Sequence, residues 1–179
     1  AEFVATLEAN PQIGWVQLPW AGVDRFAGTL KHFSTKPSPI WTSAKGSYSE
    51  PVAEHALALT LAILRGLPDK ARSTSWANPA TGITLYGRKV LVVGAGGIAV
   101  EIMRLFAPFE VEFTVVRRSA DPMPGASRTV ASADLLTVLP DADGYRFGGS
   151  WGTAADGALA GSVDGARNAE WIVTIGGSG

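Results

Sequence analysis

A glycine-rich turn follows a short apolar segment in the middle of the chain. The residues Gly94-Ala95-Gly96-Gly97-Ile98-Ala99 come directly after Val90-Leu91-Val92-Val93. This order predicts a buried strand, a tight turn and the start of a helix, whose backbone N–H groups bind phosphate oxygens. The glycine spacing is typical of sites for the pyrophosphate of a dinucleotide. We therefore predict dinucleotide binding; a plain structural turn is the alternative.

Each position of the turn has a physical role in this hypothesis. Gly94 permits the tight turn, Gly96 lets the backbone approach the phosphates, and the small Ala99 allows close packing of helix on strand. Gly97 and Ile98 complete the predicted cofactor-binding segment. Because a lone glycine pattern is weak, the prediction depends on the elements around it.

Those elements occur in the order that a nucleotide-binding unit requires. Apolar residues recur at a period near 3.6 until Pro108, which predicts a helix. A second strand follows at Val111–Val116, and a final strand is expected at Trp171–Ile175. Together they predict an α/β fold with a Rossmann-type, doubly wound parallel sheet. The helical stripe consists of Ile98, Ile102, Met103, Leu105 and Phe106.

Two arginines and a serine follow the second predicted strand. An acidic residue about 20 residues after the first glycine binds the adenosine ribose, whereas an arginine accommodates a 2′-phosphate. The difference 117 − 94 gives 23, and the residue is Arg117, followed by Arg118 and Ser119. Guanidinium groups are planar, permanently charged donors that suit a phosphate. We therefore predict NADP(H) in preference to NAD(H); two solvated surface arginines are the alternative.

A long apolar helix is expected before this unit. It begins near Ser49-Glu50-Pro51 and ends near Gly66 and Pro68. Its apolar run Ala56–Leu64 has 9 residues, too few to span a bilayer. Because the helix is apolar nearly all round, we expect burial on most sides, between domains or between subunits. Short strands are expected earlier in the chain, at Trp15–Leu18 and Ile40–Thr42.

The C-terminal part follows these patterns less well. A short helix is expected at Ala133–Leu139, with Ser132 or Asp134 near its cap. Residues 144–162 should supply another parallel strand, which is normally a near-continuous apolar run. Instead, 10 of the chain's 21 glycines fall in the last 36 residues. Glycine weakens strands, so we interpret this region as loosely specified, altered from an ancestral pattern, or imperfectly sequenced.

Composition narrows the functional classes. The net charge of −1 over 179 residues gives no basic footprint for nucleic acid. The absence of cysteine excludes disulfides and thiolate metal sites and is compatible with the cytoplasm, the expected location. His32 and His55 are too far apart for a metal-ligand pattern, so no metal site is expected. Ala1-Glu2-Phe3 lacks the basic and apolar regions of a signal peptide, and no membrane segment is expected.

Three segments together resemble the D-isomer-specific 2-hydroxyacid dehydrogenase family. Leu18–Asp24 is similar to the family's glycine–valine–aspartate loop on the substrate side, and Glu50–Leu59 to its Val-Ala-Glu helix. Gly87–Ala99 contains the cofactor turn and its strand. The order and spacing of these segments match over roughly residues 12–145. The arginines after the second strand resemble the glyoxylate and hydroxypyruvate reductase branch.

The resemblance implies a partial, flavodoxin-like substrate domain at residues 1–48 and a dinucleotide-binding domain at residues 49–179 that includes the linking helix. It implies a homodimer that transfers hydride between the nicotinamide and a small 2-oxo or D-2-hydroxy acid. Ala21 and Gly22 are assigned to the substrate. Thr174 stands where the family has an asparagine and is assigned to the cofactor.

Catalytic residues are not assigned. Family enzymes bind the substrate carboxylate with an arginine and use a histidine–glutamate pair as general acid/base. The arginine position falls near Gly177 and the pair beyond Gly179, as in an interior fragment or a chain whose termini were lost. His55 beside Glu54 is not expected to replace the pair, because adjacent helix residues point in different directions. A dinucleotide-binding module or pseudoenzyme remains the alternative; a Rossmann domain for FAD is disfavoured by the substrate-side segments.

Overall fold

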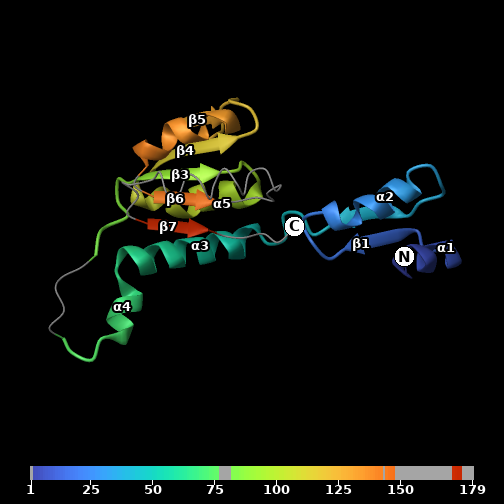
Figure 1. Cartoon of the computed structure of the whole chain (residues 1–179), viewed down its shortest axis with the longest axis horizontal. Helices are drawn as coiled ribbons and strands as arrows, with labels where there is room; N and C mark the ends of the chain where they lie inside the picture. The colour runs from blue at the N-terminus through green and yellow to red at the C-terminus, as the bar shows by residue number, and fades with distance from the viewer. Residues whose placement is uncertain (1, 77–81, 143, 148–170, 175–179) are drawn as a thin grey trace. The chain divides into compact units, whose positions relative to one another are not determined.

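The chain folds as two compact units, one up to Tyr48 and one from Ser49 onward. The computed structural model describes residues 2–76, 82–142, 144–147 and 171–174. Figure 1 shows the helices and strands of both units. Both units contain parallel strands and helices, which confirms the predicted α/β class.

The first unit is a small parallel sheet accompanied by helices. Its elements are α1 (Glu2–Ala9), β1 (Trp15–Leu18), the 3-10 turn η1 (Asp24–Phe26), α2 (Ala27–Phe33) and β2 (Ile40–Ser43). β1 and β2 pair in parallel, with Trp15 opposite Ile40, so both predicted strands are confirmed. Phe33 is buried, and its ring centroid lies 6.0 Å from that of Trp41 on β2. The helices α1 and α2 were not predicted from the sequence.

The second unit contains a larger sheet whose strands are all parallel. Its strands are β3 (Lys89–Val93), β4 (Glu112–Arg117), β5 (Arg128–Ala131), β6 (Gly144–Phe147) and β7 (Trp171–Thr174). They lie in the order β5-β4-β3-β6-β7. The chain therefore adds strands on one side of β3 and then on the other, as in a doubly wound sheet. In such sheets ligands bind at the carboxyl edge where the winding changes direction, here between β3 and β6.

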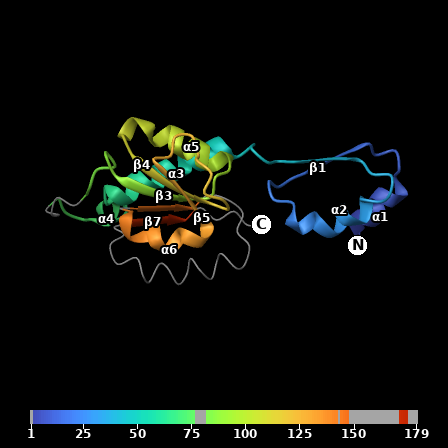
Figure 2. The same ribbon diagram turned by 90° about the horizontal axis from the view of Figure 1, so that it is seen from above.

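Helices α3 (Ser49–Leu64), α5 (Gly97–Phe106) and α6 (Leu135–Val138) cover the two faces of this sheet. The unit also contains α4 (Leu67–Arg72), which follows α3, and the 3-10 turns η2 (Ala107–Phe109), η3 (Ser132–Asp134) and η4 (Leu139–Asp141). Figure 2 shows α3 and α5 on one side of the sheet and α6 on the other. The predicted helix after the glycine turn is α5, and Pro108 follows its end, as expected.

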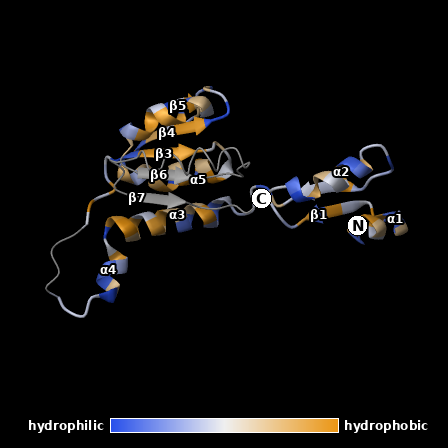
Figure 3. Cartoon of the chain, viewed as in Figure 1, coloured by the Kyte–Doolittle hydropathy of each residue, from blue (hydrophilic) through white to orange (hydrophobic). Residues whose placement is uncertain are grey.

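The alternation of side chains along β3 explains the two-sided core. Val90 and Val92 belong to one buried cluster with residues of α3 and α5, whereas Leu91 and Val93 belong to a second cluster with residues of α6. Successive side chains of a strand point to opposite faces, so a strand covered on both faces is apolar throughout. Figure 3 shows the apolar colouring of β3 and β4.

Helix α3 is buried along one side. Its buried residues are Ala53, Ala56, Thr60 and Leu64. This stripe packs within the second unit, where α3 contacts α5 and β7. Ile63 is 40% exposed in the single chain, and the expected burial of the remaining surface between domains or between subunits stays a prediction. The helix ends before Gly66, as expected, but Pro68 lies in the first turn of α4.

Two expectations concern the later part of the second unit. Gly144–Phe147 supplies the parallel strand expected from residues 144–162, despite its glycine-rich surroundings, and it pairs with β3 on one side and β7 on the other. Residues 148–162 of the expected strand region lie outside the described residues. The expected short helix is α6, and Asp134 is its N-cap residue, although the Asp134 side chain makes no cap hydrogen bond. Ser132 Oγ donates to the carbonyl oxygen of Arg117 at 2.9 Å.

Candidate functional site

The turn between β3 and α5 is held against the neighbouring strand. Gly94 has a φ of 105°, in the left-handed region that favours glycine. Its N–H donates to the carbonyl oxygen of Val116 at 2.7 Å, in addition to the β3–β4 ladder. The turn therefore lies directly beside the end of β4, where Arg117 follows Val116.

The start of α5 presents backbone donors to open space. Gly96 is extended, with φ −83° and ψ −174°, and its carbonyl accepts a hydrogen bond from the N–H of Val100 at 3.2 Å. The N–H groups of residues 97–99 precede this bond and have no partner in the helical ladder, and the helix dipole makes this end positive. A Cβ on Gly96 would meet no heavy atom within 4 Å. An anion such as a phosphate has room to approach.

Ile98 and Ala99 join this turn to the core. Ala99 is fully buried in the cluster that contains Val90 and Val92, and Ile98 is half-buried against the same cluster. A larger side chain at residue 99 would push α5 away from the sheet, since core interiors are close-packed. The side chains of Ala99 and Ile98 thus pack on the core of the second unit.

The first residue of α3 lies against the first residue of α5. A Cβ placed on Gly97 would lie 2.6 Å from Ser49 Oγ and 3.6 Å from Ser49 Cβ. The N-termini of both helices, and the Ser49 hydroxyl, therefore lie next to the glycine turn. Sequence reasoning missed Ser49 as a site residue, because 48 residues separate it from Gly97 (97 − 49).

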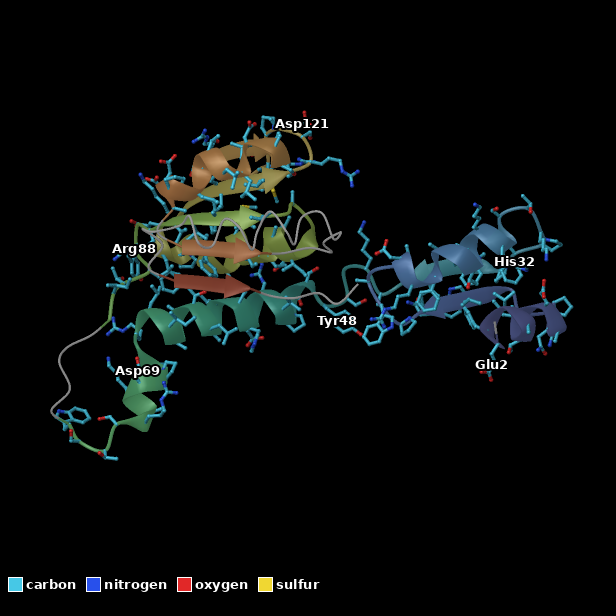
Figure 4. The ribbon with its side chains drawn as sticks, in the orientation of Figure 1. Glu2, His32, Tyr48, Asp69, Arg88 and Asp121 are labelled. Carbon is cyan, nitrogen blue, oxygen red and sulfur yellow. The ribbon has the colours of Figure 1, made fainter. Side chains whose placement is uncertain are left out.

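The side chains predicted to bind a 2′-phosphate lie at the carboxyl end of β4. Arg117 is the last residue of the strand and half-buried, and Arg118 is exposed. No ion pair or side-chain hydrogen bond engages either guanidinium among the described residues. Ser119 is half-buried, and its Oγ donates to Oδ2 of Asp121 at 2.6 Å. Asp121, labelled in Figure 4, is a neighbour that the sequence analysis did not consider.

The other predicted binding residues lie in two places. Thr174 is the last residue of β7, at the same carboxyl edge as the turn because all strands of the sheet are parallel. Ala21 and Gly22 lie in the first unit, in the loop after β1. That loop is tied to the end of β2 by a hydrogen bond of 3.1 Å from the N–H of Ala44 to the carbonyl of Trp20. Gly177 lies outside the described residues.

His55 lies on α3 without a described hydrogen-bond partner, and His32 lies in the first unit. Glu54 and His55 are both exposed on α3, and no hydrogen bond joins them. In the first unit His32 Nε2 lies 2.8 Å from Glu8 Oε1, which also accepts a hydrogen bond of 2.8 Å from Lys36 Nζ. These two contacts, Lys36 first, lower the pKa of the Glu8 carboxyl from its ordinary value of 4.5.

Within the described ranges, no three histidine, cysteine or carboxylate side chains come together in a group that could hold a metal ion. The helices within these ranges are all too short or too polar to cross a membrane.

The sequence of the second unit matches a known family. Residues 57–144, which run from α3 to the start of β6, match the sequence model of the D-isomer specific 2-hydroxyacid dehydrogenase, NAD binding domain. Through this segment the chain belongs to the D-isomer specific 2-hydroxyacid dehydrogenase family. The match contains the β3–α5 turn and the two arginines at the end of β4, so the family resemblance seen in the sequence is confirmed.

Two curated proteins are similar to this dehydrogenase-family chain. An uncharacterised protein of Corynebacterium melassecola is 31% identical over 136 residues, which cover 73% of this chain and 44% of that protein. The D-lactate dehydrogenase of Escherichia coli K12 is 31% identical over 101 residues, covering 52% of this chain and 30% of the enzyme. The chain spans less than half the length of either relative.

Solved structures show the same fold at low sequence identity. The 2-hydroxyacid dehydrogenase of Ketogulonicigenium vulgare Y25 has a TM-score of 0.68 and 18% identity over 97% of this chain and 70% of that one. The apo-structure of Escherichia coli D-lactate dehydrogenase has a TM-score of 0.65 and 22% identity, covering 96% and 55%. An acyclic imino acid reductase in complex with NADPH and D-Arg has a TM-score of 0.63 and 15% identity, covering 77% and 45%.

Proposed function

We propose that the chain binds NADP(H) and forms part of an oxidoreductase that interconverts a 2-oxo acid and a D-2-hydroxy acid. The observation that carries the proposal is the hydrogen bond from the Gly94 N–H to the Val116 carbonyl. It sets the anion-binding start of α5 beside Arg117, so one dinucleotide can place its pyrophosphate at the first and its 2′-phosphate at the second.

The proposed cofactor site consists of backbone N–H groups, guanidinium groups and hydroxyl groups. The backbone of Gly94, Gly96 and residues 97–99 would hold the pyrophosphate, and the Ser49 hydroxyl lies close enough to Gly97 to join them. Arg117, Arg118 and Ser119 favour NADP(H) over NAD(H), because guanidiniums without a described partner offer charged donors to a phosphate. We also propose that Thr174, at the same carboxyl edge of the sheet, contacts the cofactor.

In this proposal the second unit binds the cofactor and the first unit contributes to the substrate site. We assign residues 49–179 to the dinucleotide-binding domain and residues 1–48 to part of the substrate domain, with Ala21 and Gly22 facing the substrate. When bound, the nicotinamide supplies or accepts hydride at the substrate carbonyl carbon. Glyoxylate and hydroxypyruvate are the proposed substrate type, and the cytoplasm the proposed location. A homodimer is proposed because α3 keeps apolar residues such as Ile63 exposed within the described chain.

Direct titration tests the proposal. The chain is titrated with NADPH and NADH, and binding is followed by nicotinamide fluorescence at fixed ionic strength. We expect saturable binding of both, tighter for NADPH. Stronger binding of NADH would contradict the NADP(H) preference, and no binding of either would contradict the dinucleotide site.

A turnover assay separates the enzyme from a binding module. NADPH absorbance is followed with glyoxylate and with hydroxypyruvate, using the chain and a longer protein that contains it if one exists. Oxidation of NADPH supports the oxidoreductase. Tight cofactor binding without turnover in either protein would favour the alternative of a dinucleotide-binding module.

A further inference from the structure

A carboxylate lies inside the group of residues proposed to bind the 2′-phosphate. The Ser119 hydroxyl donates its hydrogen bond to Oδ2 of Asp121 at 2.6 Å, and both residues follow the two arginines at the end of β4. Asp121 is exposed, and no described cation pairs with it. The loop therefore offers both positive and negative charge to an adenosine ribose.

Asp121 and a bound 2′-phosphate would compete for the single hydroxyl proton of Ser119. A serine hydroxyl has one proton to donate. In the described structure that proton is given to Asp121. To donate it to a 2′-phosphate, Ser119 must break the bond with Asp121, and the phosphate dianion then lies near a carboxylate. A free 2′-hydroxyl imposes neither cost, because it can donate its own proton to a carboxylate.

The loop holds Asp121 in this neighbourhood. Met123, two residues later, is 7% exposed, and its N–H donates to Thr129 Oγ1 at 3.0 Å. The N–H of Ser127 donates to the carbonyl of Phe113 at 2.9 Å. These anchors on β4 and β5 limit how far the carboxylate can move from Ser119 when a ligand arrives.

We infer that Asp121 is a specificity-determining residue that reduces the preference for a 2′-phosphorylated cofactor and keeps the site open to the unphosphorylated one. The inference rests on the proposed function. Arg117 and Arg118 favour the phosphate, and Asp121 opposes them through charge and through its hold on the Ser119 proton.

The test uses ligands that contain only the adenosine end. Adenosine 2′,5′-bisphosphate and 5′-AMP, which differ by the 2′-phosphate, are titrated calorimetrically against the chain and its Asp121→Asn variant. We expect the variant to bind the bisphosphate about three- to tenfold more tightly at low ionic strength and 5′-AMP no more tightly. The gain should shrink at high salt, because exposed charges are screened.

A matched variant controls for charge in general. Asp69→Asn removes the same charge from α4, where Asp69 is paired with Arg72, and Figure 4 shows it at the opposite end of the unit from Asp121. It should leave both affinities unchanged. An equal gain in the two variants, an unchanged affinity ratio in Asp121→Asn, or a weakening of both ligands would overturn the inference.

A second substitution separates competition for the hydroxyl from simple repulsion. In a Ser119→Ala background there is no proton to compete for, so the effect of Asp121→Ala on bisphosphate affinity should be smaller than in the unaltered chain. An equal effect in both backgrounds would overturn the competition for Ser119. If the unaltered chain binds neither NADPH nor NADH, the proposed function fails first and the inference with it.

Discussion

Ser49 Oγ lies 2.6 Å from the point where the Cβ of Gly97 would be. Real Cβ atoms do not approach other heavy atoms this closely, so a side chain at residue 97 would force the Ser49 hydroxyl to move. Gly97 therefore leaves room for Ser49 between the two helix N-termini. Its neighbour Gly96 faces open space instead.

Gly97→Ala should destabilise the chain through this contact. We expect a loss of about 1–3 kcal/mol in the free energy of unfolding, typical of overpacking. In a Ser49→Ala background the Oγ is gone and only the Cβ at 3.6 Å remains, so the loss should largely disappear. Chemical denaturation of the four proteins of this double-mutant cycle measures the coupling. Additive effects would contradict the contact.

Gly96→Val should separate binding from stability. The φ of −83° suits any residue, and a Cβ there meets nothing within 4 Å, so we expect the free energy of unfolding to change by less than about 1 kcal/mol. The side chain would occupy the space proposed for the pyrophosphate, and NADPH affinity should fall at least about tenfold. Gly28→Val, on α2 with equally open space, is the matched control and should leave affinity unchanged.

Arg117→Asp should weaken NADPH selectively. A charge-assisted hydrogen bond contributes about 1.5–3 kcal/mol, so we expect a loss of roughly 10- to 100-fold for NADPH. NADH lacks the 2′-phosphate and should be nearly unaffected in fluorescence titrations. Arg65→Asp, an exposed arginine just after α3, controls for the charge change. Equal loss of both cofactors would mean that the half-buried Arg117 supports folding rather than selecting phosphate.

The Glu8 cluster predicts a pH dependence in the first unit. Because Lys36 and then His32 lower the pKa of Glu8 below 4.5, the folded state binds this proton more weakly than the unfolded state. The stabilising contribution is therefore present above pH 4.5 and is lost as the pH falls through the lowered pKa. NMR titration of the carboxyl measures it. Lys36→Met should bring the pKa back toward 4.5, whereas Lys31→Met, on α2 shortly before Lys36, should not.

The sequence predicted those features of the fold that depend on residues close together in the chain. Val90–Val93 is apolar throughout because β3 is central and covered on both faces, and the spacing of Gly94 and Gly96 follows from backbone requirements of the turn. Both features are readable without knowledge of the rest of the chain. The same holds for the end of α5, where Pro108 follows.

Features that depend on distant partners were not predictable. Gly144–Phe147 becomes a strand only because β3 and β7 pair with it, and the contact of Ser49 with Gly97 exists only after α3 packs on α5. The apolar composition of α3 predicted burial on most sides, but a helix pattern cannot say which part of its surface packs within the unit and which part has another partner. Asp121 was missed because its significance comes from a hydrogen bond with Ser119, not from a motif.

The strand order of the second unit also sets an order of assembly. Pairing of β3 with β4 joins Val90 to Phe113, across 23 residues (113 − 90), whereas pairing of β3 with β6 joins Val90 to Gly144, across 54 (144 − 90). Longer loops cost more entropy to close, and distant pairings form more slowly. The edge between β3 and β6, where the winding changes direction, is thus completed late in folding. A dinucleotide held there would recognise finished molecules and not their folding intermediates.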